Sequence, residues 1–305
     1  MRILMPIDGS TFSKAALAFI ASRSTLIESQ PDVELLNVQY PVPLRAARYA
    51  GKELVRSYHE AQAKTVIKPA LAQLKRAGLL ARAKSVIGSP GVEVGRIAAE
   101  DAADLIVMGS HGHTGFKSLL FGSVTQAVLA SCKTPLLVLR GGMVPNTLPK
   151  KESLKLGIAL DGSKYGLAAV RFVVKHLALF GPAPTLALIH VVPDLSRLRV
   201  PGVFADAPVP GFKPEQVAEM QRAAFERAFM PARKLLKATT LQVTEAQLTG
   251  NNPGDAIAAF AAKNKLDILA IGSHGEGGFV STMLGSVATR VAAKCRNALL
   301  FIQQK

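Results

Sequence analysis

The chain has 305 residues, 49% of them hydrophobic and 19% charged, which excludes intrinsic disorder and favours two domains at about 150 residues each. Two cysteines are too few for a disulfide framework, no apolar run approaches the roughly 18 residues of a membrane span, and Asp8 comes too early for a signal peptide, so we expect a cytoplasmic protein. The net charge of +16 is spread evenly, which disfavours a nucleic-acid partner and fits attraction to anions such as nucleotides.

In the first half of the chain, short apolar runs alternate with longer segments of helical spacing. The predicted strands are Ile3–Ile7, Val33–Val38, Arg82–Ile87, Leu105–Met108 and Leu136–Leu139. The helical spacing lies around Ala15–Ile20, His59–Lys75, Val92–Ala102 and Val124–Ser131. Such alternation predicts a parallel sheet with helices on both faces.

A stretch rich in glycine and proline, Gly141–Pro149, separates this half from a second one with the same order of elements. The strands predicted there are Leu156–Leu160, Thr185–Val191, Val243–Leu248, Ile268–Ile271 and Leu299–Ile302. We therefore expect an α/β chain of two tandem, doubly wound (Rossmann-like) domains, each with a five-stranded parallel sheet. Their expected limits are residues 1–140 and 154–305, joined by a linker over residues 141–153.

The two halves are copies of one unit. Asp8-Gly9-Ser10 recurs as Asp161-Gly162-Ser163, and the stretch from Val107 to Leu139 recurs from Ala270 to Ile302 with 15 identities in 33 positions. Cys132 and Cys295 fall on equivalent positions, which favours a repeated helix residue over a redox pair. The Pro-rich run from Pro193 to Pro214 has no close counterpart, and a surface loop or a lid over the second site are both open interpretations.

A glycine-rich element follows the fourth strand of each half. Gly109 and Gly112 precede nine residues and Gly122-Ser123, and the second copy keeps this spacing with Gly272, Gly275 and Gly285-Ser286. Glycines let the backbone approach an anionic group, and free N–H groups at a helix start bind anions. The alternative is a tight turn in which Ser123 only caps the helix. Because both copies keep the spacing, we favour a phosphate-binding loop, at the strand ends where doubly wound sheets bind ligands.

Other nucleotide motifs do not match. Neither copy contains the Gly-x-x-x-x-Gly-Lys-Ser/Thr of a P-loop, and the glycines follow the fourth strand rather than the first, which excludes the dinucleotide fingerprint. His111-Gly112-His113 is similar to a nucleotidyl-transfer histidine pair, but the second copy has Glu276 in place of the second histidine.

Val-Met-Gly-Ser-His-Gly-His-Thr-Gly followed by Leu-Leu-Phe-Gly-Ser-Val resembles the universal stress protein family, in its ATP-binding branch marked by Gly-x2-Gly-x9-Gly-Ser/Thr. The resemblance covers both halves, so the chain looks like a tandem member. In that family, the carboxylate after the first strand lies near ribose and adenine, the end of the second strand meets adenine, and the glycine element holds ribose and phosphates. The positions that match here are Asp8, Val38, Gly109, Gly112, Gly122, Ser123, Val124, Asp161, Val191, Gly272, Gly275, Gly285, Ser286 and Val287. For Asp8 and Asp161, a helix-cap or turn role is the alternative, and both roles are compatible.

The two sites are expected to differ. Between its glycines the first copy carries His113 and Lys117, whereas the second carries Glu276 and no base, a formal charge of +1 against −1. Beside a polyphosphate, one unit charge about 6 Å away is worth roughly 3 kcal/mol at an effective dielectric near 20, before salt screening. We expect ATP, with Mg²⁺ as its companion, in the first site, and ADP, AMP or no nucleotide in the second.

The resemblance implies an ATP-binding stress-response sensor or regulator with at most slow ATP hydrolysis, because neither copy offers an obvious catalytic residue to position water. Two alternatives are an ATP-using enzyme of the related adenine-nucleotide hydrolase-like fold, whose Ser-Gly-Gly-x-Asp-Ser loop is missing here, and a structural interaction module with vestigial sites. Family members pair through the final strand, so Pro135–Leu139 and Ala298–Ile302 are expected to pair within the chain as an internal pseudo-dimer. A homo-oligomer or a protein partner beyond that pairing is also expected.

Overall fold

The computed structural model describes residues 1–24, 31–111, 121–140, 152–194, 214–273 and 284–303. In the first half the elements are β1 (Arg2–Pro6), α1 (Thr11–Ala21), β2 (Asp32–Gln39), α2 (Leu44–Ala50), α3 (Lys52–Arg76), β3 (Ala81–Ile87), α4 (Pro90–Glu100), β4 (Leu105–Gly109), α5 (Ser123–Ser131) and β5 (Leu136–Leu139). In the second half they are β6 (Lys155–Ala159), α6 (Lys164–Lys175), a 3-10 turn η2 (Leu177–Phe180), β7 (Thr185–Val192), α7 (Pro214–Leu236), β8 (Gln242–Thr249), α8 (Pro253–Lys263), β9 (Ile268–Gly272), α9 (Ser286–Lys294) and β10 (Ala298–Ile302).

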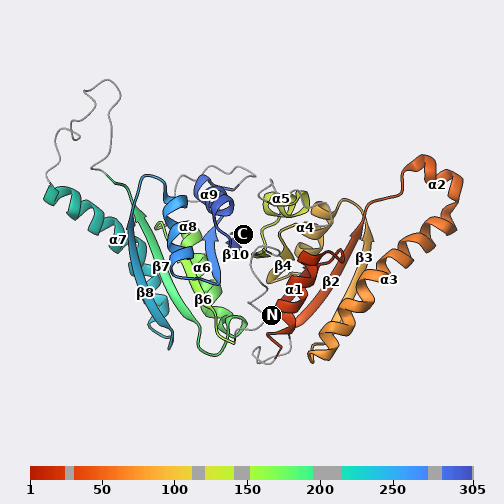
Figure 1. Cartoon of the computed structure of the whole chain (residues 1–305), viewed down its shortest axis with the longest axis horizontal. Coiled ribbons are helices and arrows are strands. Elements are labelled where there is room, and N and C mark those ends of the chain that lie inside the picture. Colours follow the sequence, from red (N-terminus) through yellow and green to blue (C-terminus); the bar gives the residue numbers. More distant parts are fainter. Residues whose placement is uncertain (25–30, 112–120, 141–151, 195–213, 274–283, 304–305) are drawn as a thin grey trace, which may run out of the picture.

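The ten strands of the described residues join one sheet in the order β3-β2-β1-β4-β5-β10-β9-β6-β7-β8, which runs along the molecule in Figure 1. Within each half the described pairings are parallel. The chain runs outward through β1, β2 and β3 and then returns to the other side of β1 for β4 and β5, and the second half repeats this order. The predicted doubly wound α/β fold is therefore confirmed, and every predicted strand lies within one residue of its observed ends.

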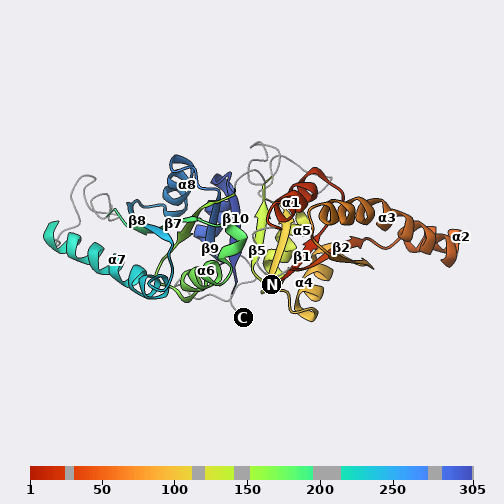
Figure 2. The ribbon, with the colours of Figure 1, turned by 90° about the horizontal axis from the view of Figure 1, so that it is seen from below.

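Two helical layers cover the sheet, one on each face. The core on one face combines side chains of α1, α3, α6 and α7, and the core on the other face combines those of α4, α5, α8 and α9. Figure 2 shows α1 and α3 on one side of the first half's strands and α4 on the other. Strands covered on both faces are apolar along their whole length, which is why Leu105–Gly109 and Ala298–Ile302 read as continuous apolar runs rather than alternating ones.

The two halves meet where β5 pairs with β10, the antiparallel step in this sheet, with Leu137 opposite Leu300. This pairing inside one chain confirms the expected internal pseudo-dimer. The contact is isologous in its detail as well. Arg140 after β5 donates from both terminal nitrogens to the carbonyls of Ala292 and Cys295 at the end of α9. Gln303 after β10 donates to the carbonyl of Leu129 near the end of α5, at 2.8 Å. Each half thus caps the last helix of the other.

One helix escaped the sequence analysis. α2 lies at the far end of the molecule from α7 (Figure 1) and contains no buried residue. Helical periodicity marks the face that a helix buries, so α2 carries no such signal. Gly51, at φ +79°, separates it from α3, which begins seven residues before the predicted His59–Lys75 segment.

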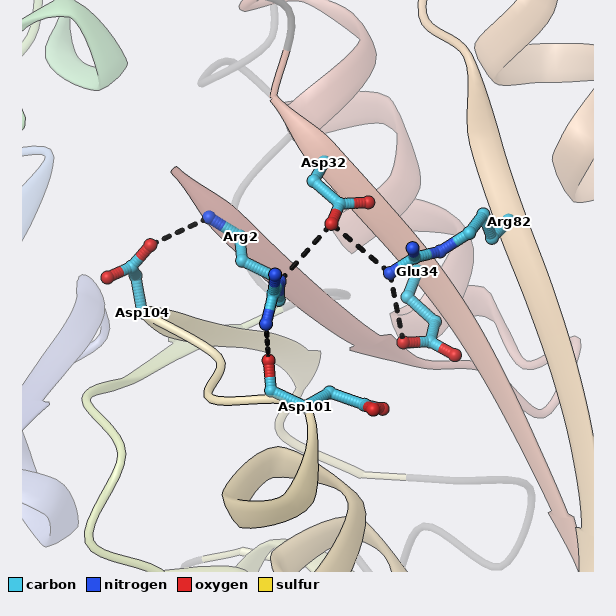
Figure 3. A network of polar contacts seen from close by, with 6 residues as sticks. All are labelled: Arg2, Asp32, Glu34, Arg82, Asp101 and Asp104. Carbon is cyan, nitrogen blue, oxygen red and sulfur yellow. Dashed lines mark hydrogen bonds and ion pairs between the residues drawn. The ribbon is translucent and has the colours of Figure 1, made fainter.

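At the amino-terminal edge of the first half, a network of charges joins three strands and a loop (Figure 3). Asp32 accepts hydrogen bonds from Arg2 and Arg82, both at 3.2 Å. Arg82 also lies 3.7 Å from the carboxylate of Glu34, whose side chain is buried beside Asp101. Burial and the neighbouring Asp101 carboxylate raise the pKa of Glu34 above its ordinary value, against the opposing pull of Arg82. This edge is opposite to the one where the candidate site lies.

Candidate functional site

The strand order reverses between β1 and β4 in the first half and between β6 and β9 in the second. Ligands of doubly wound sheets bind outside the carboxyl ends of such strands. Asp8 follows β1 and Gly109 ends β4, so the structure brings both to one reversal point, and Asp161 and Gly272 occupy the matching one. We call these the first site and the second site.

The Asp-Gly-Ser segments are tight turns that start α1 and α6. Asp8 Oδ1 accepts from the Ser10 N–H at 2.9 Å, and Ser10 Oγ in turn accepts from the Ser13 N–H at 3.2 Å as the helix cap. The second half repeats both contacts: Asp161 Oδ1 accepts from the Ser163 N–H at 2.9 Å, and Ser163 Oγ accepts from the Gly166 N–H at 3.3 Å. The alternative interpretation of Asp8 and Asp161 as turn residues is therefore confirmed. The turn fixes each carboxylate at the carboxyl edge of the sheet.

Gly109 is required by packing. A Cβ there would lie 2.5 Å from the Cβ of Phe12 and 2.6 Å from its backbone carbon, so α1 passes directly over the end of β4. Packing against Phe12 is thus enough to require glycine at this position, and the approach of its backbone to an anion stays a prediction. Its peptide groups remain at the carboxyl end of β4, where the backbone contact predicted from the family resemblance would form.

Each glycine loop is closed at its base by one backbone hydrogen bond. Gly122 donates to the carbonyl of Ser110 at 2.8 Å, and Gly285 donates to that of Ser273, also at 2.8 Å. Gly112 and Gly275, together with the charged residues between the glycines, lie outside the described residues. The bond fixes where the loop returns to the sheet, directly before α5 and α9.

The helices that follow the loops begin with no side-chain cap. Gly122 and Gly285 are the N-cap residues, and Ser123 and Ser286 are the first helical residues, with their side chains exposed. The alternative role of Ser123 as a cap is therefore wrong, because a glycine occupies that position. The first-turn N–H groups of both helices, including those of Val124 and Val287, follow directly on the loop closure and are not used inside the helix, an arrangement that favours an anion.

The adenine side of the predicted site is set by the second strand of each half. Val38 and Val191 are half-buried near the ends of β2 and β7, and they pack on the core shared with α4, α5, α8 and α9. Their neighbours in sequence point to the opposite face. There Asn37 donates to the carbonyl of Ile7 at 3.0 Å, and His190 contacts the carbonyl of Leu160 through Nδ1 at 2.7 Å. These carbonyls directly precede Asp8 and Asp161.

The sequence analysis missed three polar side chains at the sites. His190 interrupts an otherwise apolar strand, a signal that would have singled it out. Asn37 gives no such signal, because its strand also carries Asp32, Glu34 and Gln39. Thr125, only 1% exposed, donates to the carbonyls of Gly109 and Ser110 at 3.2 and 3.4 Å and so ties α5 to the end of β4. Its equivalent in α9 is Ala288, so the second half lacks this contact.

No group of three or more His, Cys, Asp or Glu side chains within the described ranges is arranged as a metal site. Of the helices that the structure describes, none is both long and apolar enough to cross a bilayer.

Fold and site together define a protein of two tandem, doubly wound α/β units, joined as an internal pseudo-dimer, with a glycine-capped helix at each reversal point. A sequence profile of the universal stress protein family matches residues 1–140 and again residues 154–303. The chain therefore belongs to the universal stress protein family, as a tandem-domain member.

Individual relatives agree with this assignment. A universal stress protein of Mycolicibacterium smegmatis is 23% identical over 319 residues, which cover 99% of this chain and 97% of that protein. Universal stress protein MJ0577 of Methanocaldococcus jannaschii is 38% identical over 68 residues, a match that spans 22% of this chain and 42% of the relative. The crystal structure of a universal stress protein from Archaeoglobus fulgidus superposes with a TM-score of 0.69 at 23% identity, covering 100% of this chain and 98% of that one.

Proposed function

We propose that the protein binds adenine nucleotides at the two sites and acts as a nucleotide-dependent regulator in a stress response. The observation that carries this proposal is a pair of features that recurs at the reversal point of each half. One is an aspartate turn after the first strand, and the other is a helix after the fourth strand that has a glycine N-cap and no side-chain cap. The helix start suits phosphates, and a carboxylate accepts hydrogen bonds from ribose hydroxyls. The residues proposed to contact nucleotide are those named from the sequence, with Gly109 and Gly272 acting through their backbone.

The proposal includes unequal occupancy. Two independent differences support it: the loop charges of +1 and −1 read from the sequence, and Thr125, which ties the loop base to α5 in the first half where the second half has Ala288. A site held in its binding geometry loses less entropy when the ligand binds. We propose ATP with Mg²⁺ for the first site, and a less charged adenine nucleotide or no ligand for the second.

No catalytic residue is proposed. Hydrolysis needs a group that positions water and cations that stabilise the charge of the γ-phosphate. Of the described side chains near the first site, Asp8 is the carboxylate and His111 the base, and His111 lies against Ser110 and Phe12. We therefore propose that any ATP turnover is slow. We also propose that the two domains end at residue 140 and begin at residue 154, which limited proteolysis tests. Self-association of the chain is a further part of the proposal, and light scattering tests it.

The deciding experiment is to denature freshly purified protein, identify the released nucleotide by mass and count it per chain. A value near one ATP per chain supports both nucleotide binding and unequal occupancy. A value near two supports nucleotide binding and overturns the unequal occupancy. No nucleotide, together with no binding of added Mg-ATP, overturns it and favours a structural interaction module. Phosphate release over hours at 37 °C separates the regulator from an ATP-using enzyme.

A further inference from the structure

A chain of side-chain hydrogen bonds leads away from the first site along β2 and ends on α3. Asn37 donates to the carbonyl of Ile7 at 3.0 Å and accepts from Gln39 Nε2 at 3.0 Å. Gln39 Nε2 also donates to the carbonyl of His59 at 2.9 Å, while Gln39 Oε1 lies 2.8 Å from His59 Nδ1. Asn37 and His59 are 5% and 7% exposed. Because each amide nitrogen donates, each amide oxygen accepts, so His59 Nδ1 carries the proton.

The two ends of this chain have different surroundings. At one end, Ile7 directly precedes Asp8 and the turn of residues 8–10. At the other, His59 lies in the second turn of α3, the helix against which α2 packs. α2 has no buried residue, and Tyr49 in it is 97% exposed. Directional hydrogen bonds therefore link the Asp8 turn to the part of the first half that protrudes furthest into solvent (Figure 2).

The second half shows what a site without this link looks like. His190 contacts the carbonyl of Leu160 directly, and the position of Gln39 is taken by Val192, which is fully buried. The contact of His190 with α7 is the edge of the Phe229 ring, with centroids 6.3 Å apart. Among the described residues, the side chain that holds the aspartate turn of the second half meets the long helix at an aromatic ring. The polar contacts of α7 with this half, from Gln221 to the carbonyl of Pro193 at 3.2 Å and from Arg233 to Glu245 at 2.7 Å, do not involve His190.

We propose that Asn37, Gln39 and His59 are positioning residues of the first site, which hold the Asp8 turn in its nucleotide-binding geometry and transmit nucleotide occupancy to α3 and α2. The proposal rests on nucleotide binding at that site. Buried hydrogen bonds have fixed directions, and breaking one leaves an unpaired polar group in a medium of low dielectric. A displacement of the Asp8 turn therefore moves the carbonyl of Ile7, the two amides and His59 together, or breaks the chain. Within the part of the second half that the structure describes, no side-chain path of this kind joins His190 to α7, so we expect occupancy of the second site to stay local.

The first test uses full-length protein carrying Gly285→Phe, so that only the first site is read. Mg-ATP is titrated by calorimetry, and hydrogen exchange is measured over residues 44–60 with and without Mg-ATP. In the parent we expect Mg-ATP to slow exchange in this segment. Gln39→Val, which installs the residue found at Val192, is expected to weaken Mg-ATP binding about tenfold and to abolish that protection. Ser85→Ala is the matched control, because Ser85 lies at the long distance of 3.5 Å from Gln39 Nε2, and it should change neither quantity.

The second test separates positioning from transmission. Asn37→His combined with Gln39→Val copies the His190 and Val192 pair, which the second half accommodates. We expect this double variant to restore affinity to within about twofold of the parent while the Mg-ATP-dependent protection stays absent. The double variant also provides the test of transmission if Gln39→Val alone does not fold. Parent-like affinity and protection in Gln39→Val, or affinity that the double variant leaves low, overturns the inference. No Mg-ATP binding in the unmodified chain instead overturns the proposed function, and the inference with it.

Discussion

The two halves make the same backbone contacts with different side chains around them. At the amino-terminal edge, Arg2 donates its backbone N–H to Asp104 at 2.8 Å, and Lys155 donates its own to Asp267 at 2.9 Å. Beside that shared contact the first half buries Glu34, whereas the equivalent position of the second half is Ala187. At the carboxyl edge, both halves keep the aspartate turn, the 2.8 Å loop closure and the glycine N-cap. What the halves share is therefore the backbone geometry with the aspartates that hold its turns, and what separates them is the other polar side chains around it.

This difference indicates which features serve both sites and which serve only one. Backbone features that occur twice serve the requirement that both sites have in common, which we propose is nucleotide binding. Side chains that occur once, such as Thr125 and Gln39, determine how tightly one site is held and what it contacts. Substitutions that affect the shared backbone contacts should therefore cost most, and those that affect only one half's charges should cost least.

The largest effect is expected from Gly109→Ala. The new Cβ would lie 2.6 Å from the backbone carbon of Phe12, so α1 must shift, and we expect a loss of about 3 kcal/mol in unfolding free energy. Gly157→Ala creates an equally short contact of 2.5 Å, but with the end of the flexible Leu266 side chain, so a loss of about 1 kcal/mol is expected. Urea denaturation followed by circular dichroism measures both.

Gly95→Ala is the control, because the nearest atom to its Cβ would be Ser131 Oγ at an ordinary 3.4 Å and alanine favours a helix. It should be neutral or stabilising by up to about 1 kcal/mol. If Gly157→Ala costs as much as Gly109→Ala, the distinction between backbone and side-chain neighbours does not hold.

The next effect concerns the pseudo-symmetric caps at the β5–β10 junction. Arg140 lies over the ring of Phe121 at 5.0 Å, and burial lowers the pKa of its guanidinium without neutralising it. Arg140→Ala would leave two carbonyls at the end of α9 unpaired, so we expect a loss of about 2–3 kcal/mol. Gln303→Ala removes one neutral hydrogen bond to Leu129 and should cost about 1 kcal/mol. Thermal unfolding of both variants checks the order, and equal losses would show that the two caps are equivalent in energy as well as in position.

The sequence predicted those features that arise from local pattern. Apolar runs such as Leu136–Leu139 gave the strands, the repeat gave the two units, and two apolar final strands gave the internal pairing. It could not give α2, which buries nothing, or the packing role of Gly109, which depends on Phe12 almost a hundred residues away. The hydrogen-bond chain from Asn37 to His59 escaped for the same reason, because the positions it joins lie on different elements and no period in the sequence relates them.

A smaller effect is expected from Glu34, and it depends on pH. Burial beside Asp101 raises the pKa of Glu34, so the folded protein binds this proton more tightly than the unfolded chain does. The stability that the proton contributes is present below the ordinary glutamate pKa and is lost as pH rises through the raised one. Glu34→Gln should remove this loss, so the variant gains stability relative to the parent between pH 4 and pH 7. Urea denaturation at several pH values measures the gain. Ala187→Gln in the second half is the control and should leave the slope unchanged.

The smallest effect is expected from His176, and its sign is opposite. Burial, with Lys175 beside it, lowers the pKa of His176 despite the attraction of Asp104, so the unfolded chain binds this proton more tightly than the folded protein. The stability is complete above the ordinary histidine pKa and falls as pH drops below it toward the lowered value. The equivalent position in the first half is Arg23, which stays charged throughout this range and adds no slope. His176→Gln should therefore flatten the pH dependence between pH 5 and pH 7, whereas Glu34→Gln leaves this acid-side loss in place. If His176→Gln and the parent lose stability in parallel below pH 6, the acid sensitivity lies elsewhere in the chain.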